Sequence, residues 1–207
     1  MTDEDLGLRE RKKQQTRTAL SWAAVRLCVT NGYENVRVED IAAEAGVSLR
    51  TFRNYFANKA EAIVARERDR AMLVAGELRA RPAAEPLWDA LNAAVHTHLS
   101  MGVDGDTDQP PTPDWVTGVQ AMIAHPAVRG EALRALADAE GQLARAVAER
   151  TGTDADHDLY PRLVAATATA ARSAALAHWQ RADPPVAIGP LLTDAFSQLA
   201  AGLPEPS

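Results

Sequence analysis

The chain has 207 residues, of which 46% are hydrophobic and only 5% aromatic, and its formal net charge is −6. Abundant alanine with few clusters of β-branched residues favours helices over sheets. The single cysteine, Cys28, excludes an intrachain disulfide, and no apolar run approaches the ~20 residues that a membrane-spanning helix needs. The acidic N-terminus lacks the pattern of a signal peptide. Composition therefore predicts a soluble, cytoplasmic, all-α protein without a membrane partner.

Charge is distributed unevenly along the chain. Residues 6–59 hold ten Lys and Arg against five Asp and Glu, a net charge of +5, whereas residues 61–207 hold twelve against twenty, a net charge of −8. A basic N-terminal part on an acidic remainder is typical of a protein whose N-terminal domain binds nucleic acid. A basic surface that only faces solvent would give the same pattern, so charge alone does not separate the two interpretations.

Hydrophobic periodicity and capping residues predict the helices in chain order. Residues 9–30 carry an apolar stripe at helical spacing, which Gly32 ends. Two short helices follow at 38–45 and 49–55, and Ser48 is expected to cap the second. Residues 102–112, rich in Gly, Asp and Pro, are expected to form a mobile loop. Further helices are predicted at 59–80, 86–101, 113–124, 127–150, 158–182 and 186–201, which makes nine helices and no sheet.

The segment from Ile41 to Ser48 fits a helix-turn-helix, in which the second helix enters the major groove of DNA. Gly46 suits the positive φ of the tight turn. The following helix presents Leu49, Arg50, Arg53 and Asn54 to solvent, where Arg can pair with guanine and Asn with adenine. Side chains placed to position the phosphate backbone are Thr51, Tyr55 and Lys59. An ordinary helical hairpin with a polar face is the alternative interpretation.

Residues 17–63 resemble the DNA-binding domain of the TetR family of transcriptional regulators. The matching positions are Arg17, Leu20, Ala23-Ala24, Leu27, Gly32-Tyr33, Val38, Ile41-Ala42, Ala45-Gly46-Val47-Ser48, Thr51-Phe52, Tyr55-Phe56 and Lys59. Three positions depart from the pattern, and the first, Cys28 in place of a common Phe, is interpreted as a small core residue. Arg37 stands where the family usually caps the second helix with Thr or Ser, so Arg37 is a candidate phosphate contact. Arg53 stands where Tyr is common and is a candidate base contact.

The resemblance implies a three-helix DNA-binding domain at residues 12–72 and a ligand-binding and dimerisation domain at 73–207. It also implies a homodimer formed by the last two long helices, within 158–201, and a palindromic operator in double-stranded DNA. Ser48, at the start of the recognition helix, is included among the expected DNA-contacting residues. The function implied is that of a repressor, which a small effector releases from DNA.

Two apolar helix faces are candidates for the pocket of a small, largely hydrophobic effector. One face carries Trp88, Leu91, Val95 and Leu99, and the other carries Trp115, Val119 and Met122. Large aromatic and Met side chains offer adaptable apolar area to a ligand. Trp179 and Arg172 are added, the latter as an anchor for an anionic group. The alternatives are that the two faces close on each other as core and that Arg172 pairs with a carboxylate.

Patterns that would indicate a metal site or an enzyme are weak. His96 and His98 are two residues apart and do not share a helix face, and Asp104, Asp106 and Asp108 lack the later ligands of a calcium loop. No catalytic motif is present, so no catalytic residue, metal or cofactor is expected. The leading interpretation is a ligand-released repressor. The second is a regulator of the same fold without a small-molecule inducer, such as an activator or a partner-controlled protein, and an enzyme is the least favoured.

Overall fold

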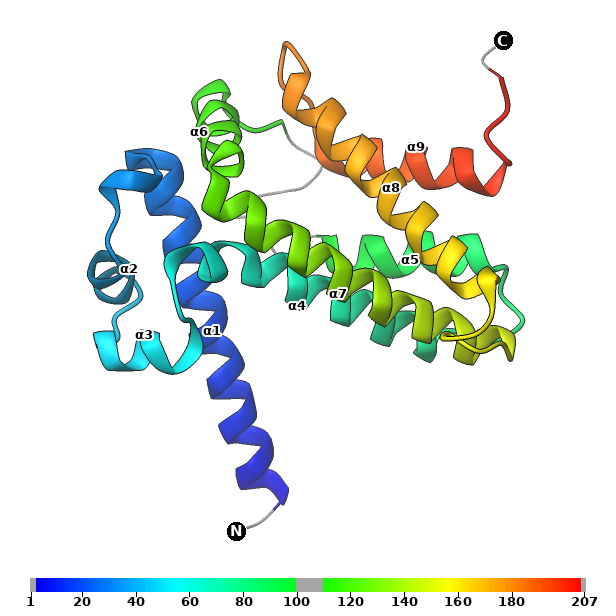
Figure 1. Cartoon of the computed structure of the whole chain (residues 1–207), viewed down its shortest axis with the longest axis horizontal. Helices are drawn as coiled ribbons and strands as arrows, with labels where there is room; N and C mark the ends of the chain where they lie inside the picture. The colour runs from blue at the N-terminus through cyan, green and yellow to red at the C-terminus, as the bar shows by residue number, and fades with distance from the viewer. Residues whose placement is uncertain (1–2, 100–109, 206–207) are drawn as a thin grey trace. The chain divides into compact units, whose positions relative to one another are not determined.

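In a computed structural model the described residues, 3–99 and 110–205, form nine α-helices and one 3₁₀ turn, with no strand among them (Figure 1). The side chains of residues 3–7, 10 and 99 are not described. The helices are α1 (Asp3–Asn31), α2 (Val38–Glu44), α3 (Leu49–Tyr55), α4 (Lys59–Ala80), α5 (Leu87–Leu99), α6 (Pro113–Ala124), α7 (Pro126–Thr151), α8 (Leu159–Arg181) and α9 (Ile188–Ala200). The predicted all-α fold with nine helices is confirmed. None of the described helices combines the length and low polarity needed to cross a bilayer.

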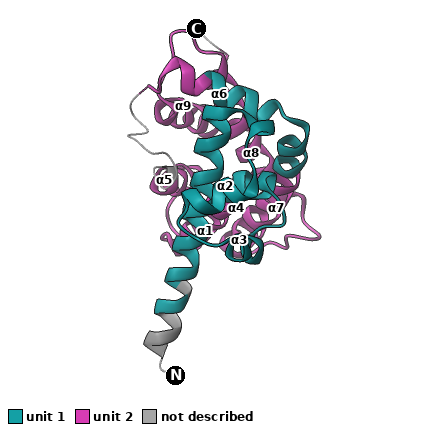
Figure 2. Cartoon of the chain, turned by 90° about the vertical axis from the view of Figure 1, so that its left-hand side faces the viewer, with its two compact units in different colours: residues 1–66, 117–133 teal, residues 67–116, 134–207 magenta. Residues whose placement is uncertain are grey.

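The chain groups into two compact units (Figure 2). Unit 1 comprises Met1–Arg66 with Thr117–Leu133, and unit 2 comprises Glu67–Val116 with Arg134–Ser207. The limits of the units fall inside α4, α6 and α7. Neither unit is therefore continuous in sequence. The two domains expected from the sequence, at residues 12–72 and 73–207, stay a prediction.

The core of unit 1 forms around α1. Leu20, Ile41, Phe52 and Phe56, from α1, α2, α3 and the residue after α3, are each at most 1% exposed. Ser21 is a buried polar residue of this core, and its Oγ donates to the carbonyl of Ala62 at 2.6 Å. Burial of this hydroxyl is therefore compensated by a hydrogen bond that ties α1 to α4.

A glycine allows α6 to approach α1 inside unit 1. A Cβ built on Gly118 would lie 2.5 Å from the carbonyl oxygen of Val29 and 2.6 Å from its Cγ1. Such distances are far below van der Waals contact, so a larger residue would push the two helices apart. Gly118 is thus one reason why Thr117–Leu133 packs with the N-terminal helices.

The core of unit 2 is built from α4, α5, α7, α8 and α9. Its fully buried members are small or aliphatic apart from Phe196, and α9 packs against both α8 and α5. The cluster consists of Ala75, Leu78, Ala90, Leu91, Val95, Ala146, Val147, Val164, Ala168 and Phe196, with Val74, Leu87, Trp88 and Leu143 packed at its edge.

Candidate nucleic-acid interface

The turn between α2 and α3 has the geometry that the sequence predicted. Gly46 has φ +68°, and the amide of Val47 donates to the carbonyl of Ala42 at 2.9 Å. This bond satisfies a carbonyl that the end of α2 would leave without a helical partner. Ser48 then caps α3, because its Oγ accepts from the amide of Thr51 at 3.1 Å. The predicted Gly46 turn and Ser48 cap are confirmed.

The start of α2 is capped from within the helix. Arg37 occupies the N-cap position and its side chain makes no cap bond, as expected of a group without an acceptor. Instead the carboxylate of Asp40 accepts from the amide of Arg37 at 2.8 Å. The Arg37 side chain is exposed and takes no part in holding the helix end.

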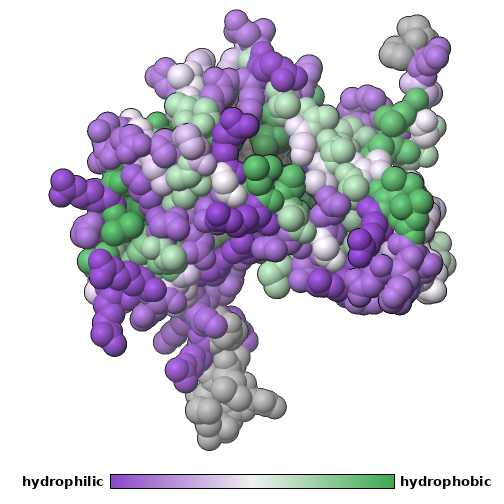
Figure 3. Space-filling model, viewed as in Figure 1, coloured by the Kyte–Doolittle hydropathy of each residue, from purple (hydrophilic) through white to green (hydrophobic). Residues whose placement is uncertain are grey.

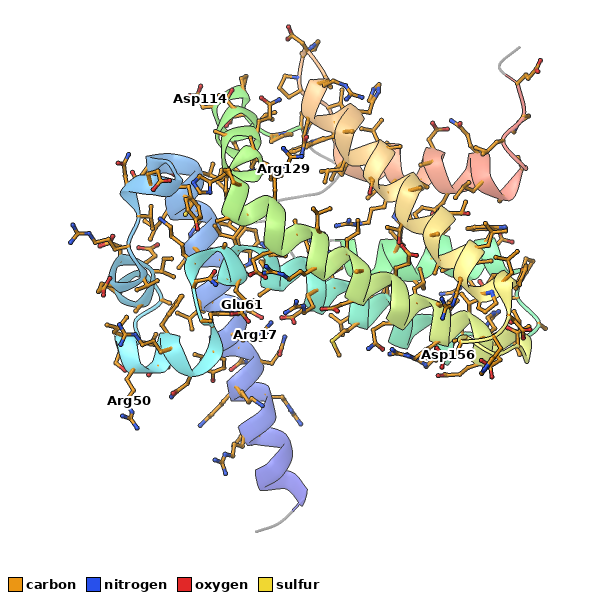
Figure 4. All side chains as sticks on the ribbon, viewed as in Figure 1. Arg17, Arg50, Glu61, Asp114, Arg129 and Asp156 are labelled. Atoms are coloured by element: carbon orange, nitrogen blue, oxygen red, sulfur yellow. The ribbon has the colours of Figure 1, made fainter. Side chains whose placement is uncertain are left out.

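Helix α3 has one buried and one exposed face. Phe52 and, just after the helix, Phe56 are 1% exposed, and their ring centroids lie 5.8 Å apart. The opposite face presents Arg50, Arg53 and Asn54 to solvent, and Figure 4 shows Arg50 pointing away from the ribbon. Hydrophilic side chains cover this part of the surface in Figure 3. Of the other predicted contacts, Ser48 is exposed, whereas Leu49, Thr51 and Tyr55 are half-buried.

The connection from α3 to α4 is held by polar contacts. The Asn58 side chain accepts from the amide of Glu61 at 2.9 Å, and the Glu61 carboxylate accepts from the amide of Ala57 at 2.7 Å. The Arg17 guanidinium lies 4.8 Å from the centre of the Phe56 ring, and both Arg17 and Glu61 can be followed in Figure 4. These contacts fix the end of α3 to α1 and α4.

Lys59 has a structural role that sequence reasoning missed. Its ammonium donates to the carbonyls of Tyr33 and Val36, the latter at 2.8 Å, and lies 3.9 Å from the centre of the Tyr33 ring. The lysine thereby joins the start of α4 to the segment between α1 and α2. The Lys59 ammonium already donates hydrogen bonds to these two carbonyls. Its expected contact with a DNA phosphate stays a prediction.

The Tyr33 ring also contacts the corner between α6 and α7. His125 stacks on it at 3.9 Å between centroids, and the His125 Nε2 lies 2.7 Å from a carboxylate oxygen of Glu34. The histidine Nδ1 accepts from the amide of Ala127 at 3.3 Å. The loop that precedes α2 is therefore held on one side by Lys59 and on the other by His125.

The predicted effector residues do not form one described pocket. Leu91 and Val95 are buried in the core of unit 2 with Trp88 at its edge, and Val119 and Met122 are buried in unit 1. Trp115 and Trp179 are half-buried in unit 2, and the side chain of Leu99 lies outside the described residues. Two surface hollows of the described structure are lined by other residues: one by residues of α4 and α7, the other by residues of α1.

Arg172 lies in a cluster of charges within unit 2. It forms an ion pair with Glu67, which also accepts from Arg70 at 2.8 Å. Burial lowers the pKa of both guanidinium groups. Of the two roles open to Arg172, the structure shows the pairing with a carboxylate, while its contact with an anionic ligand stays a prediction.

The residues weighed as metal ligands have separate surroundings. His96 Nε2 lies 2.6 Å from the Thr193 hydroxyl, and His98 Nε2 lies 3.9 Å from the Glu77 carboxylate. Asp104, Asp106 and Asp108, and most of the predicted 102–112 loop, lie outside the described residues.

Comparison with known proteins places both parts of the sequence in one family. Residues 22–65 match the family described as bacterial regulatory proteins, tetR family, and residues 85–204 match the MftR C-terminal domain. The HTH-type transcriptional regulator TcmR of Streptomyces glaucescens is 34% identical over 180 residues, which cover 86% of this chain and 79% of TcmR. The putative mycofactocin biosynthesis transcriptional regulator MftR of Mycobacterium tuberculosis is 27% identical over 193 residues, 93% of each chain.

A solved structure agrees on the fold. The fatty acid degradation regulator FadR of Bacillus halodurans superposes with a TM-score of 0.59 at 17% identity, over 92% of this chain and 97% of FadR. The helix-turn-helix geometry, the matched domains and the similarity to TcmR together establish that the chain belongs to the TetR family of bacterial transcriptional regulators and carries its DNA-binding domain.

Proposed function

We propose that this protein is a homodimeric repressor that binds a palindromic operator through α3 and leaves it when a small, largely hydrophobic molecule binds unit 2. The observation that carries the proposal is the two-sided character of α3. Phe52 and Phe56 fix one face in the core, and Arg50, Arg53 and Asn54 stand on the other. A rigidly held helix can place such side chains against base edges without a further ordering cost.

The proposed DNA-contacting residues divide into two roles. Arg50 and Arg53 pair with guanine and Asn54 with adenine, because their donor and acceptor patterns match those bases in the major groove. Leu49 provides an apolar contact to a thymine methyl group. The remaining proposed contacts hold phosphates and fix the register of the helix on the duplex; they are Arg37, Ser48, Thr51, Tyr55 and Lys59.

Exposed apolar side chains on α8 support a dimer. Leu159, Tyr160 and Leu163 are 76%, 49% and 55% exposed. Large apolar groups gathered on one helix are typical of a surface that another protein covers. A two-fold pair of chains would present two α3 helices to one face of DNA, which requires a palindromic operator. Light scattering at micromolar concentration should give the mass of a dimer, and Leu159→Asp with Leu163→Asp should give a monomer.

The effector part of the proposal rests on the apolar interior of unit 2. Trp88, Leu91 and Val95 provide a face that a hydrophobic molecule would occupy by separating α5 from its neighbours. A ligand that prefers the conformation unsuited to DNA lowers operator affinity by its differential binding alone. A tenfold release needs only ~1.4 kcal/mol of coupling. The other ligand contacts proposed in unit 2 are Trp115, Trp179 and Arg172. The remaining ligand-contacting residues predicted from the sequence are Leu99, Val119 and Met122.

A regulator without a small-molecule inducer is the second candidate. It is favoured by one observation: Leu91 and Val95 are packed in the core, at 0% and 9% exposure, and neither described hollow borders them. In that case unit 2 would serve only dimerisation or contact with a partner protein.

One experiment separates the candidates. An operator is first selected from random-sequence duplexes with the full-length protein, and hydrophobic compounds are then titrated into the complex. Release by any compound, weakened in Trp88→Ala and unaffected by Trp22→Ala in unit 1, supports the ligand-released repressor. Failure of every compound to release the operator supports the second candidate, and failure to select any operator contradicts both.

A further inference from the structure

Helix α1 continues well beyond the core of unit 1. It begins at Asp3, yet Leu20 is its first fully buried side chain among those described. The described side chains from Leu8 to Gln15 are exposed, and Leu8 is 51% exposed. Figure 1 shows this part of α1 leaving the other helices of unit 1 on the side where α3 lies. About two turns of described, exposed helix therefore extend past the helix-turn-helix.

Basic residues occupy this projecting part of α1. Arg9, Arg11, Lys12 and Lys13 are all exposed. The acidic residues Asp3, Glu4 and Asp5 lie nearer the N-terminus, and Glu10 lies between the basic ones, so the excess of positive charge is confined to residues 9–13. Leu8, 51% exposed, is the one large apolar side chain described among residues 8–15, so this stretch has no apolar face of the kind that would indicate a protein partner.

Helical register places two of these cations on the face of α1 that carries Leu20. Arg9 and Lys13 precede Leu20 by eleven and seven residues, which at about 100° per residue is within about 20° of its direction, and Lys12, eight residues before it, lies about 80° away at the border of this face. Leu20 faces the core, and Arg17, close to this face, lies 4.8 Å over Phe56, the residue after α3. Because α1 is one continuous helix, the face of Arg9 and Lys13 leads to the turn that carries Arg17, next to the end of α3 (Figure 4).

The projection is long enough to reach beyond the bases that α3 contacts. Arg9 lies eight residues before Arg17, which at 1.5 Å per residue is about 12 Å. A duplex rises about 3.4 Å per base pair along each strand, so 12 Å corresponds to about three to four base pairs. Cations at that distance meet backbone phosphates next to the sequence read by α3.

We propose that Arg9, Lys12 and Lys13 form a second, sequence-independent DNA contact, which holds backbone phosphates flanking the operator. The inference rests on the proposed operator binding by α3, but the contact is separate from it. The occupant is the phosphate backbone of duplex DNA, for which the charge and the continuity with the α3 surface both argue. Each phosphate that a cation neutralises makes the logarithm of affinity fall more steeply with the logarithm of salt, by about 0.9.

The test compares two duplexes and two variants of the full-length chain. The short duplex ends at the borders of the selected operator, and the long one adds ten arbitrary base pairs on each side. The arm variant carries Arg9→Gln, Lys12→Gln and Lys13→Gln. The control variant removes the same charge from α7 through Arg129→Gln, Arg134→Gln and Arg145→Gln, all at exposed positions. Thermal unfolding confirms that both variants fold.

We expect the arm variant to bind the long duplex about tenfold or more weakly at low salt, with a slope shallower by about 2 to 3 for each bound chain. Its loss on the short duplex should be several times smaller, its selected sequence unchanged, and the control variant should bind both duplexes like the unmodified protein. Equal losses on the two duplexes, or an unchanged slope on the long one, would overturn the flanking contact. If no duplex can be selected at all, the proposed operator binding has failed rather than the arm.

Discussion

The two units use their positive charges differently. In unit 2 arginines are engaged by carboxylates of the same unit: Arg79 with Glu149 at 2.6 Å, and Arg81 with Glu85 at 2.6 Å. In unit 1 Arg50 stands exposed on a helix whose other face is buried. Within unit 1 pairing is selective, because Arg26 pairs with Glu44 at 3.1 Å whereas Arg50 and Arg53 on α3 are exposed. The difference teaches that an acidic chain can carry a nucleic-acid-binding surface when exposed arginines are kept on one helix.

The largest expected effect concerns the support of α3. Phe52→Ala should lower the free energy of unfolding by ~3–5 kcal/mol, because it removes a fully buried ring, and should abolish operator binding. Phe196→Ala in unit 2, where Phe196 is 2% exposed, should cost a similar amount without displacing α3. Hydrogen–deuterium exchange should rise in α1 to α3 for the first variant and in α5, α8 and α9 for the second. The same helices loosening in both variants would show that the two units do not respond separately.

A smaller loss is expected where α6 meets α1. Gly118→Ala places a Cβ 2.5 Å from the Val29 carbonyl oxygen, and overpacking of this kind costs ~1–3 kcal/mol. Gly130→Ala is the matched control in α7, since nothing outside the backbone of its own helix and its two chain neighbours lies within 4 Å of the added Cβ. There alanine should be neutral or stabilising by up to ~1 kcal/mol. Urea denaturation measures both, and equal midpoints for the two variants would refute the close approach at Gly118.

Substitutions at Lys59 and Arg37 distinguish a residue that supports the fold from one that only binds phosphate. Lys59→Ala removes charge-assisted hydrogen bonds to two carbonyls and should cost ~1.5–3 kcal/mol of stability, with operator affinity reduced alike for all sequences. Arg37→Ala, at an exposed side chain without a cap bond, should leave stability unchanged within ~0.5 kcal/mol. Both should make the salt slope of binding shallower by about 0.9 for each phosphate that is no longer neutralised. An Arg37 variant with an unchanged slope would remove this residue from the interface.

The smallest effect is an acid sensitivity specific to unit 2. Hydrogen bonds from Arg81 and Arg79 lower the pKa of Glu85 and Glu149 below the ordinary value of 4.5. When folding lowers the pKa of a carboxyl group, the ionised group stabilises the folded protein at pH values above the pKa that it has in the unfolded chain. This stabilisation is lost as the pH falls through the pKa that the group has in the folded protein. Unit 2 should therefore open more readily below about pH 4.5, and Arg79→Gln should reduce that dependence. Exchange measured between pH 6 and pH 3.5 tests this, and equal acid sensitivity in the Arg79→Gln variant would contradict it.

Local signals explain which parts of the fold the sequence could predict. The limits of α3, α4 and α6 agree to the residue, because Ser48, Asn58 and Pro113 mark where these helices can begin. The predicted start of α1 is six residues too late, since residues 3–8 carry no apolar stripe at helical spacing that would indicate a helix. The packing of Thr117–Leu133 with unit 1 depends on the approach of Gly118 to Val29, which no local pattern indicates.

In the candidate DNA-binding site, too, local features could be predicted from the sequence and long-range contacts could not. The exposed face of α3 follows from helical periodicity, so Arg50, Arg53 and Asn54 could be identified from their spacing. The partners of Lys59 are carbonyls 23 and 26 residues earlier in the chain. Such distant backbone contacts leave no mark on residue types, and this role of Lys59 therefore required the structure.

The most direct test of the central claim is a parallel operator selection with the unmodified protein, Arg53→Ala and Arg145→Ala. Arg53 is exposed on α3, and Arg145 is exposed on α7 in unit 2. If α3 reads the bases, Arg53→Ala should lose preference at one position of each half-site, at a cost of ~1–3 kcal/mol in operator affinity, while Arg145→Ala selects the original sequence with the original affinity. Unchanged affinity and sequence preference in Arg53→Ala would contradict the base contact assigned to Arg53, and the same result for Arg50→Ala would remove α3 as the reading helix.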